Sequence, residues 1–389
     1  MRIGIDSVKK LMYFDNAATT FPKPEEVYRK VDHIMRNVGA NPGRSGHRMA
    51  LEANRIILDT RDSIAKLFNI EDSSRIVFTS NTTEALNIGI KGLLRPGDHA
   101  ITSSMEHNSV VRPLKAMEKT GVECTRVRCS SEGILDPEDV RAAIRQGTRL
   151  IAITHASNVT GSINPIREIG AIARERGVRF LVDAAQSAGV LPIDVIADRI
   201  DMLACPGHKG LFGLQGTGFL YISPSVRLEP IKDGGTGGNS EMDTMPDTLP
   251  ERFEAGTMNT PGIGGLGEGV EFVLREGIDK IRSHEANLTD RLMKGLVEIK
   301  GVTVYGPRDA YRQMAVVSFN ITGKDPSDVG FVLDSSFGIM ARVGLHCAPD
   351  AHRTIGTFPQ GTVRLSPGYF NTSEEVDFVI HAVRKICSI

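Results

Sequence analysis

The stretch LIAITHASNVTGSINPIREIGAIARERGVRFLVDAAQ, residues 150–186, decides the fold class of this chain. Its short apolar run at 150–154 predicts a strand, its amphipathic run at 166–176 predicts a helix, and its second apolar run at 178–183 predicts another strand. Strands that alternate with helices imply a mostly parallel sheet with helices on both faces, which is an α/β fold. Ligands of such sheets bind at the carboxyl ends of the strands.

The same alternation extends on both sides of this stretch. We expect further strands at 75–79, 99–103, 202–204 and 218–222, and further helices at 84–94 and 110–120. A Gly-rich polar loop at 233–250, a long helix at 264–281 and a smaller α+β unit follow. We therefore expect a large, mostly parallel-sheet domain at 17–263 and a small α+β domain made of 1–16 and 264–389.

The composition excludes several classes of partner. The chain has 389 residues, a net charge of −1 and 40% hydrophobic residues, which gives no electrostatic footprint for nucleic acid or an anionic membrane surface. No apolar run is long enough to cross a bilayer, and residues 1–15 lack the apolar core of a signal peptide. We expect no nucleic-acid and no membrane partner.

The cysteines are odd in number, scattered and without a CxxC pair: Cys124, Cys129, Cys205, Cys347 and Cys387. This pattern argues against a disulfide framework and favours a cytoplasmic protein. His346, Cys347 and His352 lack a fourth ligand at a useful spacing, so we expect no metal site. A GxGxxG at 262–267 follows no strand, which indicates close helix packing rather than a dinucleotide site.

Two residues at strand ends, Asp183 and Lys209, suit one kind of cofactor. Asp183 closes the strand at 178–183, where it could bind a metal, a ribose or a pyridinium nitrogen, or cap a helix. Lys209 stands in Gly207-His208-Lys209-Gly210, whose glycines leave the open approach that an imine-forming lysine needs. A pyridinium ring acts as an electron sink when a carboxylate keeps its nitrogen protonated, so the pair predicts a lysine-bound cofactor ring.

Other polar residues follow the remaining strands. Thr82 and Thr83 open a helix whose N–H groups and hydroxyls would hold a phosphate. Asn81 and Glu84 also have the spacing of a purely structural capping box. His107 could stack on a ring, shuttle a proton or make a structural hydrogen bond.

Three more stretches carry candidates for the substrate side of a site. Asn158 could contact a ring substituent or cap a turn. The stretch Arg342-Val-Gly-Leu-His346-Cys347 puts a cysteine beside a histidine in a Gly-rich loop. Arg364 lies in a strand-like run, and a buried arginine usually pairs with a carboxylate from the protein or from a substrate.

In their order along the chain, these motifs resemble the class V aminotransferase family of fold-type I PLP-dependent transferases, where PLP is pyridoxal 5′-phosphate. The resemblance runs from Phe14-Asp15-Asn16-Ala-Ala-Thr19 to Tyr369-Phe-Asn371-Thr372 and points to the SufS-like group II cysteine desulfurases and their selenocysteine lyase relatives. It implies a homodimer that converts L-cysteine, or a related small amino acid, to L-alanine. The sulfur would be left on an enzyme cysteine as a persulfide and passed to a sulfur-acceptor protein.

The resemblance also implies roles for individual residues. Lys209 would bind the cofactor as an imine, Asp183 would pair with the ring nitrogen, and Gln186 would contact the phenolic oxygen. His107 would stack over the ring. The phosphate would be held by Thr82, Thr83, His208 and, from the second subunit, Thr257. On the substrate side the resemblance implies Asn158 beside the substrate and the ring, Arg364 on the α-carboxylate, and Cys347 as the sulfur-accepting nucleophile. Arg342 is the alternative residue for the α-carboxylate.

Three departures from the family pattern bear on the substrate. Pro206 stands where a serine is common, Leu345 replaces a histidine, and the stretch 234–238 differs in detail. Two other classes of function stay open. One is a PLP lyase or aminotransferase on another amino acid, and the other is a sulfur carrier or dimeric scaffold that kept the fold without turnover.

Overall fold

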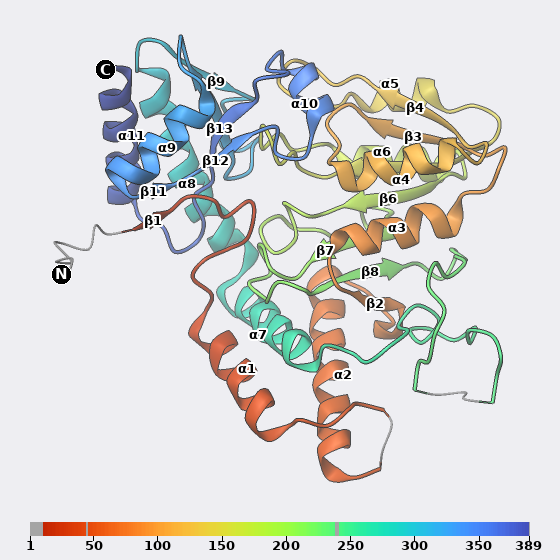
Figure 1. Ribbon diagram of the computed structural model, residues 1–389. Helices are drawn as coiled ribbons and strands as arrows, with labels where there is room; N and C mark the ends of the chain where they lie inside the picture. Colours follow the sequence, from red (N-terminus) through yellow and green to blue (C-terminus); the bar gives the residue numbers. More distant parts are fainter. Residues whose placement is uncertain (1–10, 44–45, 238–240, 389) are drawn as a thin grey trace.

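The computed structural model describes residues 11–43, 46–237 and 241–388. A seven-stranded sheet forms its centre, with the strand order β2-β8-β7-β6-β5-β3-β4 (Figure 1). Its strands are β2 (Ile76–Thr79), β3 (His99–Ser103), β4 (Glu123–Val127), β5 (Thr148–Thr154), β6 (Arg179–Asp183), β7 (Met202–Pro206) and β8 (Gly218–Ile222). β8 pairs antiparallel with β2 and with β7, and the other strand pairs in this sheet are parallel, so the predicted α/β class is confirmed.

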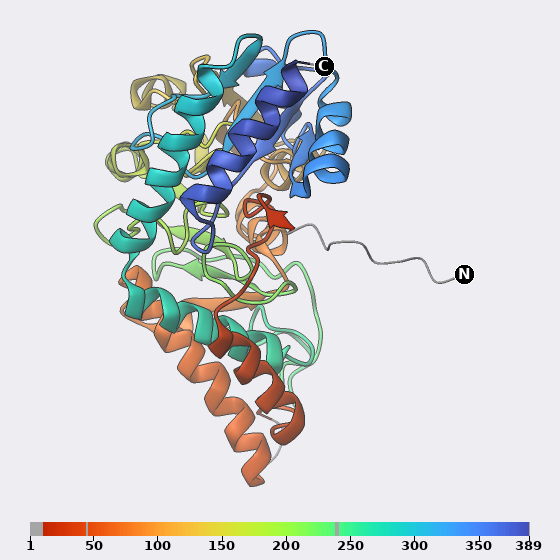
Figure 2. The same ribbon diagram turned by 90° about the vertical axis from the view of Figure 1, so that its left-hand side faces the viewer.

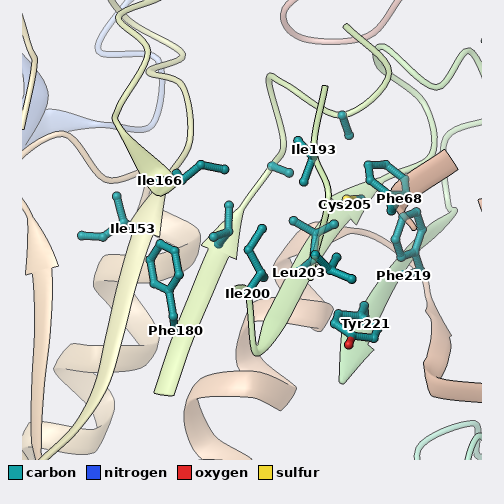
Figure 3. Close-up of a cluster of buried hydrophobic side chains, with 14 of the residues drawn as sticks. Phe68, Ile153, Ile166, Phe180, Ile193, Ile200, Leu203, Cys205, Phe219 and Tyr221 are labelled. Carbon is teal, nitrogen blue, oxygen red and sulfur yellow. The ribbon is translucent and has the colours of Figure 1, made fainter. Parts of the chain in front are cut away.

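Helices cover both faces of the sheet. On one face α3 (Thr82–Leu93) and α4 (Asn108–Glu118) pack on buried strand residues such as Leu150. On the other face α2 (Arg48–Phe68), α5 (Pro137–Ala143) and α6 (Ile166–Glu175) contribute to a cluster that includes Ile153, Phe180 and Phe219 (Figure 3). Strands buried on two faces read as continuous apolar runs, and this is why most of them are visible in the sequence.

The small domain has a four-stranded antiparallel sheet of order β12-β13-β10-β9. Its strands are β9 (Val302–Tyr305), β10 (Val317–Ile321), β12 (Arg342–Gly344) and β13 (Thr362–Leu365). Its helices are α8 (Ile278–Val297), α9 (Pro326–Phe337), α10 (Pro349–Thr354) and α11 (Ser373–Cys387). β1 (Met12–Tyr13) pairs with β11 (Ile339–Met340), so the start of the described chain lies on this domain (Figure 2).

The expected single helix at 264–281 is wrong, because two helices cover this region. α7 (Thr260–Glu276) ends at Gly277, which has a φ of 85°, and α8 follows in another direction. α7 packs against α1 (Glu25–Asn37) and α2, whereas α8 packs against α11. We therefore propose Gly277 as the domain boundary instead of the expected one between 263 and 264.

The glycines of the GxGxxG stretch lie on the packed face of α7. A Cβ on Gly264 would lie 2.3 Å from the Ile34 side chain, and one on Gly265 would lie 2.8 Å from Val31. These glycines therefore serve close helix packing, as the sequence indicates. In the described residues we find no helix that is long and apolar enough to cross a membrane.

Candidate active site

The carboxyl ends of the parallel strands and the loops that follow them enclose a cavity of about 210 Å³. Asp183 is the last residue of β6, and Lys209 follows β7. The structure brings most of the expected cofactor residues together on this cavity wall: Thr82, Thr83, His107, Asn158, Asp183, Gln186, His208 and Lys209. Ser109 lies on the same wall and carries no signal in the sequence.

Lys209 has the electrostatic surroundings of a reactive amine. Its side chain is half-buried and lines the cavity. Burial first, and then the nearby Arg364, lower the pKa of Lys209 to about 8, although Asp183 acts in the opposite direction. About a tenth of Lys209 is therefore neutral, and hence nucleophilic and basic, at pH 7, which is far more than for an ordinary lysine with a pKa near 10.4.

Asp183 lines the cavity, and only 3% of its surface is exposed to solvent. Its Oδ1 accepts a hydrogen bond from the backbone N–H of Ala185 at 2.9 Å, and the structure gives this carboxylate no other partner among the described residues. Burial raises the pKa of Asp183 to about 6. A cation placed against this carboxylate, such as a protonated ring nitrogen, would restore its usual preference for the charged form.

The part of the cavity wall around the start of α3 could bind a phosphate. Thr82 Oγ1 and His208 Nδ1 are buried, and neither has a hydrogen-bond partner within the described parts of the chain. Buried polar atoms are rarely left unpaired, so two on one cavity wall indicate a bound polar group. Asn81 Oδ1 caps α3 by accepting a hydrogen bond from the Glu84 N–H at 3.0 Å. The helix start therefore has both the structural cap and the unpaired Thr82 hydroxyl that a phosphate could use.

His107 is fixed where a flat ring could stack on it. It is the N-cap residue of α4, and its Nδ1 accepts from the backbone N–H of Ser109 at 3.1 Å. The Ser109 hydroxyl lies 2.8 Å from both His107 Nδ1 and Thr83 Oγ1, which links the two expected site residues. Burial, and then the Lys209 charge, lower the pKa of His107 to about 4, so its imidazole is neutral at physiological pH.

Arg364, on β13, lies behind Asn158 and is 1% exposed. Its Nη2 pairs with Asp15 Oδ1 at 2.7 Å, and its Nη1 donates to the Asn158 carbonyl at 3.0 Å. Its Nε has no partner among the residues that the structure describes. The carboxylate that the sequence leaves open is therefore Asp15 in this structure, a residue of the first family motif to which the sequence assigns no role.

Cys347 lies in the loop after β12 and is exposed. His346 and Cys347 have φ values of 48° and 59°, the left-handed region that side chains of this kind rarely adopt. The Cys347 carbonyl accepts from the Asn108 N–H at 2.8 Å, and the His346 carbonyl accepts from Asn158 Nδ2 at 2.7 Å. Such local strain is typical of functional loops, and these bonds hold the thiol beside the cavity.

Arg364 and Cys347 do not line the cavity, and neither do the remaining expected residues, Arg342 and Thr257. Arg342 Nη2 donates to Cys347 Sγ at 3.6 Å, so this arginine lies with the thiol. Thr257 is exposed and does not line the cavity of its own chain. In the stretch 234–238, Gly238 lies outside the described residues. Burial raises the pKa of Cys124 and Cys129 to about 11, so these thiols stay protonated.

Comparison with known proteins places this geometry in a family. The sequence model of the class V aminotransferases matches residues 12–379. A probable cysteine desulfurase of Methanothermobacter thermautotrophicus is 38% identical over 100% of this chain and 98% of that protein, and one of Pyrococcus abyssi is 37% identical over 99% and 96%. A cysteine desulfurase structure from Thermococcus onnurineus NA1 superposes with a TM-score of 0.91 at 36% identity, over 97% of this chain and 95% of that one. The chain therefore belongs to the class V aminotransferase family.

Proposed function

We propose that this protein is a PLP-dependent cysteine desulfurase that converts L-cysteine to L-alanine and accepts the sulfur on Cys347. The observation that carries the proposal is the position of an exposed thiol beside a cavity that holds Lys209 and Asp183. The names of full-length relatives support the same substrate.

The residues present fit PLP. Lys209 would bind it covalently, Asp183 would pair with its ring nitrogen, and the unpartnered Thr82 and His208 atoms would meet its phosphate. When bound, PLP supplies an electron sink beside the α-carbon of the substrate. Pro206, which ends β7, offers no hydroxyl, so Thr82 and Thr83 would provide those contacts.

The chain's own groups then divide the work. Arg364 would bind the substrate α-carboxylate through its Nε, which is buried and has no partner among the described residues, while Asp15 holds its guanidinium in place. The Lys209 amine, released from its bond, takes the α-proton, which a pKa of about 8 permits near neutral pH. Cys347 Sγ attacks the substrate sulfur, the Cβ–S bond breaks toward carbon, and an S–S bond forms on Cys347. Cβ then takes up one proton, and Lys209 returns the α-proton to Cα, which completes alanine.

We also propose that a second copy of the chain completes the site. Thr257 is exposed and lies outside its own cavity, so it is available to reach the phosphate of a partner. A symmetric pair is the commonest oligomer. Sedimentation should therefore give a dimer, and an active monomer at micromolar concentration would contradict this.

The function is tested by product analysis. Purified protein loaded with PLP should form alanine from L-cysteine, with L-selenocysteine and cysteine sulfinate as comparison substrates. Borohydride reduction followed by mass spectrometry should place the cofactor on Lys209, and Lys209→Ala should abolish both the adduct and alanine formation. Ammonia with pyruvate, or a keto acid, as the product from L-cysteine would instead indicate a lyase or an aminotransferase.

A further inference from the structure

A second hollow, of about 360 Å³, opens beside the cofactor cavity, and we call it the acceptor groove. It runs between α3 and α4 and is lined by Thr83, Asn87, Lys91, His107, Asn108, Ser109, Arg112, Pro113 and Cys347. Three of these residues, Thr83, His107 and Ser109, also line the cofactor cavity. The groove therefore connects the site of sulfur release to the surface past Cys347.

The groove is positively charged. Lys91 and Arg112 line it, and none of its lining residues is an aspartate or glutamate. Neither cation has an ion-pair partner among the described residues, whereas Glu84 and Glu118 on the same two helices pair with Lys232 and Lys115. The field of Arg112 reaches the site, because it contributes to the lowered pKa of His107. An unpaired cation on a groove wall favours an anionic occupant.

We propose that the acceptor groove receives a small thiol that carries one or more carboxylates and takes the sulfur from Cys347. The volume is in the range of small-molecule sites, which favours a small thiol over a protein loop. This inference rests on the proposed role of Cys347 as the persulfide carrier.

The transfer balances without an oxidant. The thiolate of the acceptor attacks the outer sulfur of the Cys347 persulfide, and a new S–S bond forms. The bond between Cys347 Sγ and the outer sulfur breaks, and Cys347 leaves as a thiolate with the electron pair. Arg342, which donates to Cys347 Sγ at 3.6 Å, stabilises that charge.

The test compares two thiols that differ in one charge. The PLP-loaded protein is first charged with L-cysteine, and intact-protein mass spectrometry confirms the persulfide on Cys347. Discharge is then timed with 3-mercaptopropionate and with the neutral 3-mercapto-1-propanol. The anionic thiol should act about fivefold faster at low salt, which is the size of one exposed ion pair, and this advantage should shrink as salt screens the groove.

Charge reversal locates the effect. In the double variant Lys91→Glu/Arg112→Glu the ratio of the two rates should fall to one or below, whereas Lys119→Glu, at the end of α4 and outside the groove, should keep the wild-type ratio. Equal rates in the wild type, or an unchanged ratio in the double variant, would overturn the inference alone. Absence of any persulfide on Cys347 would overturn the proposed function as well.

Discussion

The cofactor cavity and the Cys347 loop lie side by side, but they are built in opposite ways. The cavity is held by the large sheet, and residues such as Asp183 are buried and fixed by main-chain hydrogen bonds. Cys347 belongs to the small domain and is exposed, and both Cys347 and the preceding His346 have positive φ values. Asp183, which would keep the cofactor ring protonated, has to stay in a fixed position. Cys347, which would carry sulfur away from the site, needs access to solvent. Each prediction below changes one side of this comparison and leaves the other intact.

The largest effect is expected from Cys347→Ser. Alanine forms only when the Cβ–S bond breaks toward carbon, and this needs a thiolate to receive the sulfur, so alanine formation from L-cysteine should stop. The absorbance of the bound cofactor should stay normal, because Cys347 does not line the cofactor cavity. Activity on L-selenocysteine should persist in part, since selenium is expelled more readily.

Cys387→Ser is the matched control, because Cys387 ends α11 and lies outside both hollows. It should keep the wild-type rate. Wild-type desulfuration in Cys347→Ser would make Cys347 structural, and a general PLP lyase or aminotransferase would then be the better description.

A smaller effect is expected on the substrate side. Arg364→Ala should raise KM for L-cysteine about 10- to 100-fold, because one charged, hydrogen-bonded contact is worth about 1.5–3 kcal/mol. The cofactor spectrum should not change. Arg364→Lys should rescue only in part, since a point charge cannot both pair with Asp15 and present a fork. An unchanged KM in both variants would move the carboxylate site to Arg342.

The smallest effect concerns pH. Burial and Arg364 lower the pKa of Lys209 to about 8, so its neutral form is already half populated at that pH. The rate of borohydride-trapped PLP attachment to the cofactor-free protein should rise up to pH 8 and then only about twofold more by pH 10. A free lysine derivative, with a pKa near 10.4, should keep rising about tenfold per pH unit over this range. A protein profile that follows the free amine would show that Lys209 is not perturbed.

The sequence predicts most of the large sheet well, including the edge strand β2, but misses the strand at the other edge. β5 and β6 are continuous apolar runs because both of their faces are buried. β4 lies at the edge of the sheet, and only Val127 is buried on it, so its polar sequence gives no strand signal. The expected helix at 264–281 fails at Gly277, because an apolar pattern continues across a change of chain direction that only tertiary packing defines.

The site shows the same division. Asp183 and Lys209 are predictable because parallel strands bring their ends to one edge. Asp15 and Ser109 are not, since each acts through a partner that is distant in sequence or carries no motif. Their roles depend on which segments the fold brings together, and that information is absent from a single sequence.

The burial of Cys124, Cys129 and Cys205 has a consequence for damage as well as for catalysis. Burial raises the pKa of Cys124 and Cys129 to about 11 and that of Cys205 well above its usual range, so these residues offer little thiolate to any oxidant. Cys347 is exposed. We therefore expect peroxide to reach Cys347 first and, at high dose, to carry it beyond the reversible sulfenic acid. The residue that makes the protein useful as a sulfur donor is thus also the point at which oxidative stress would switch it off.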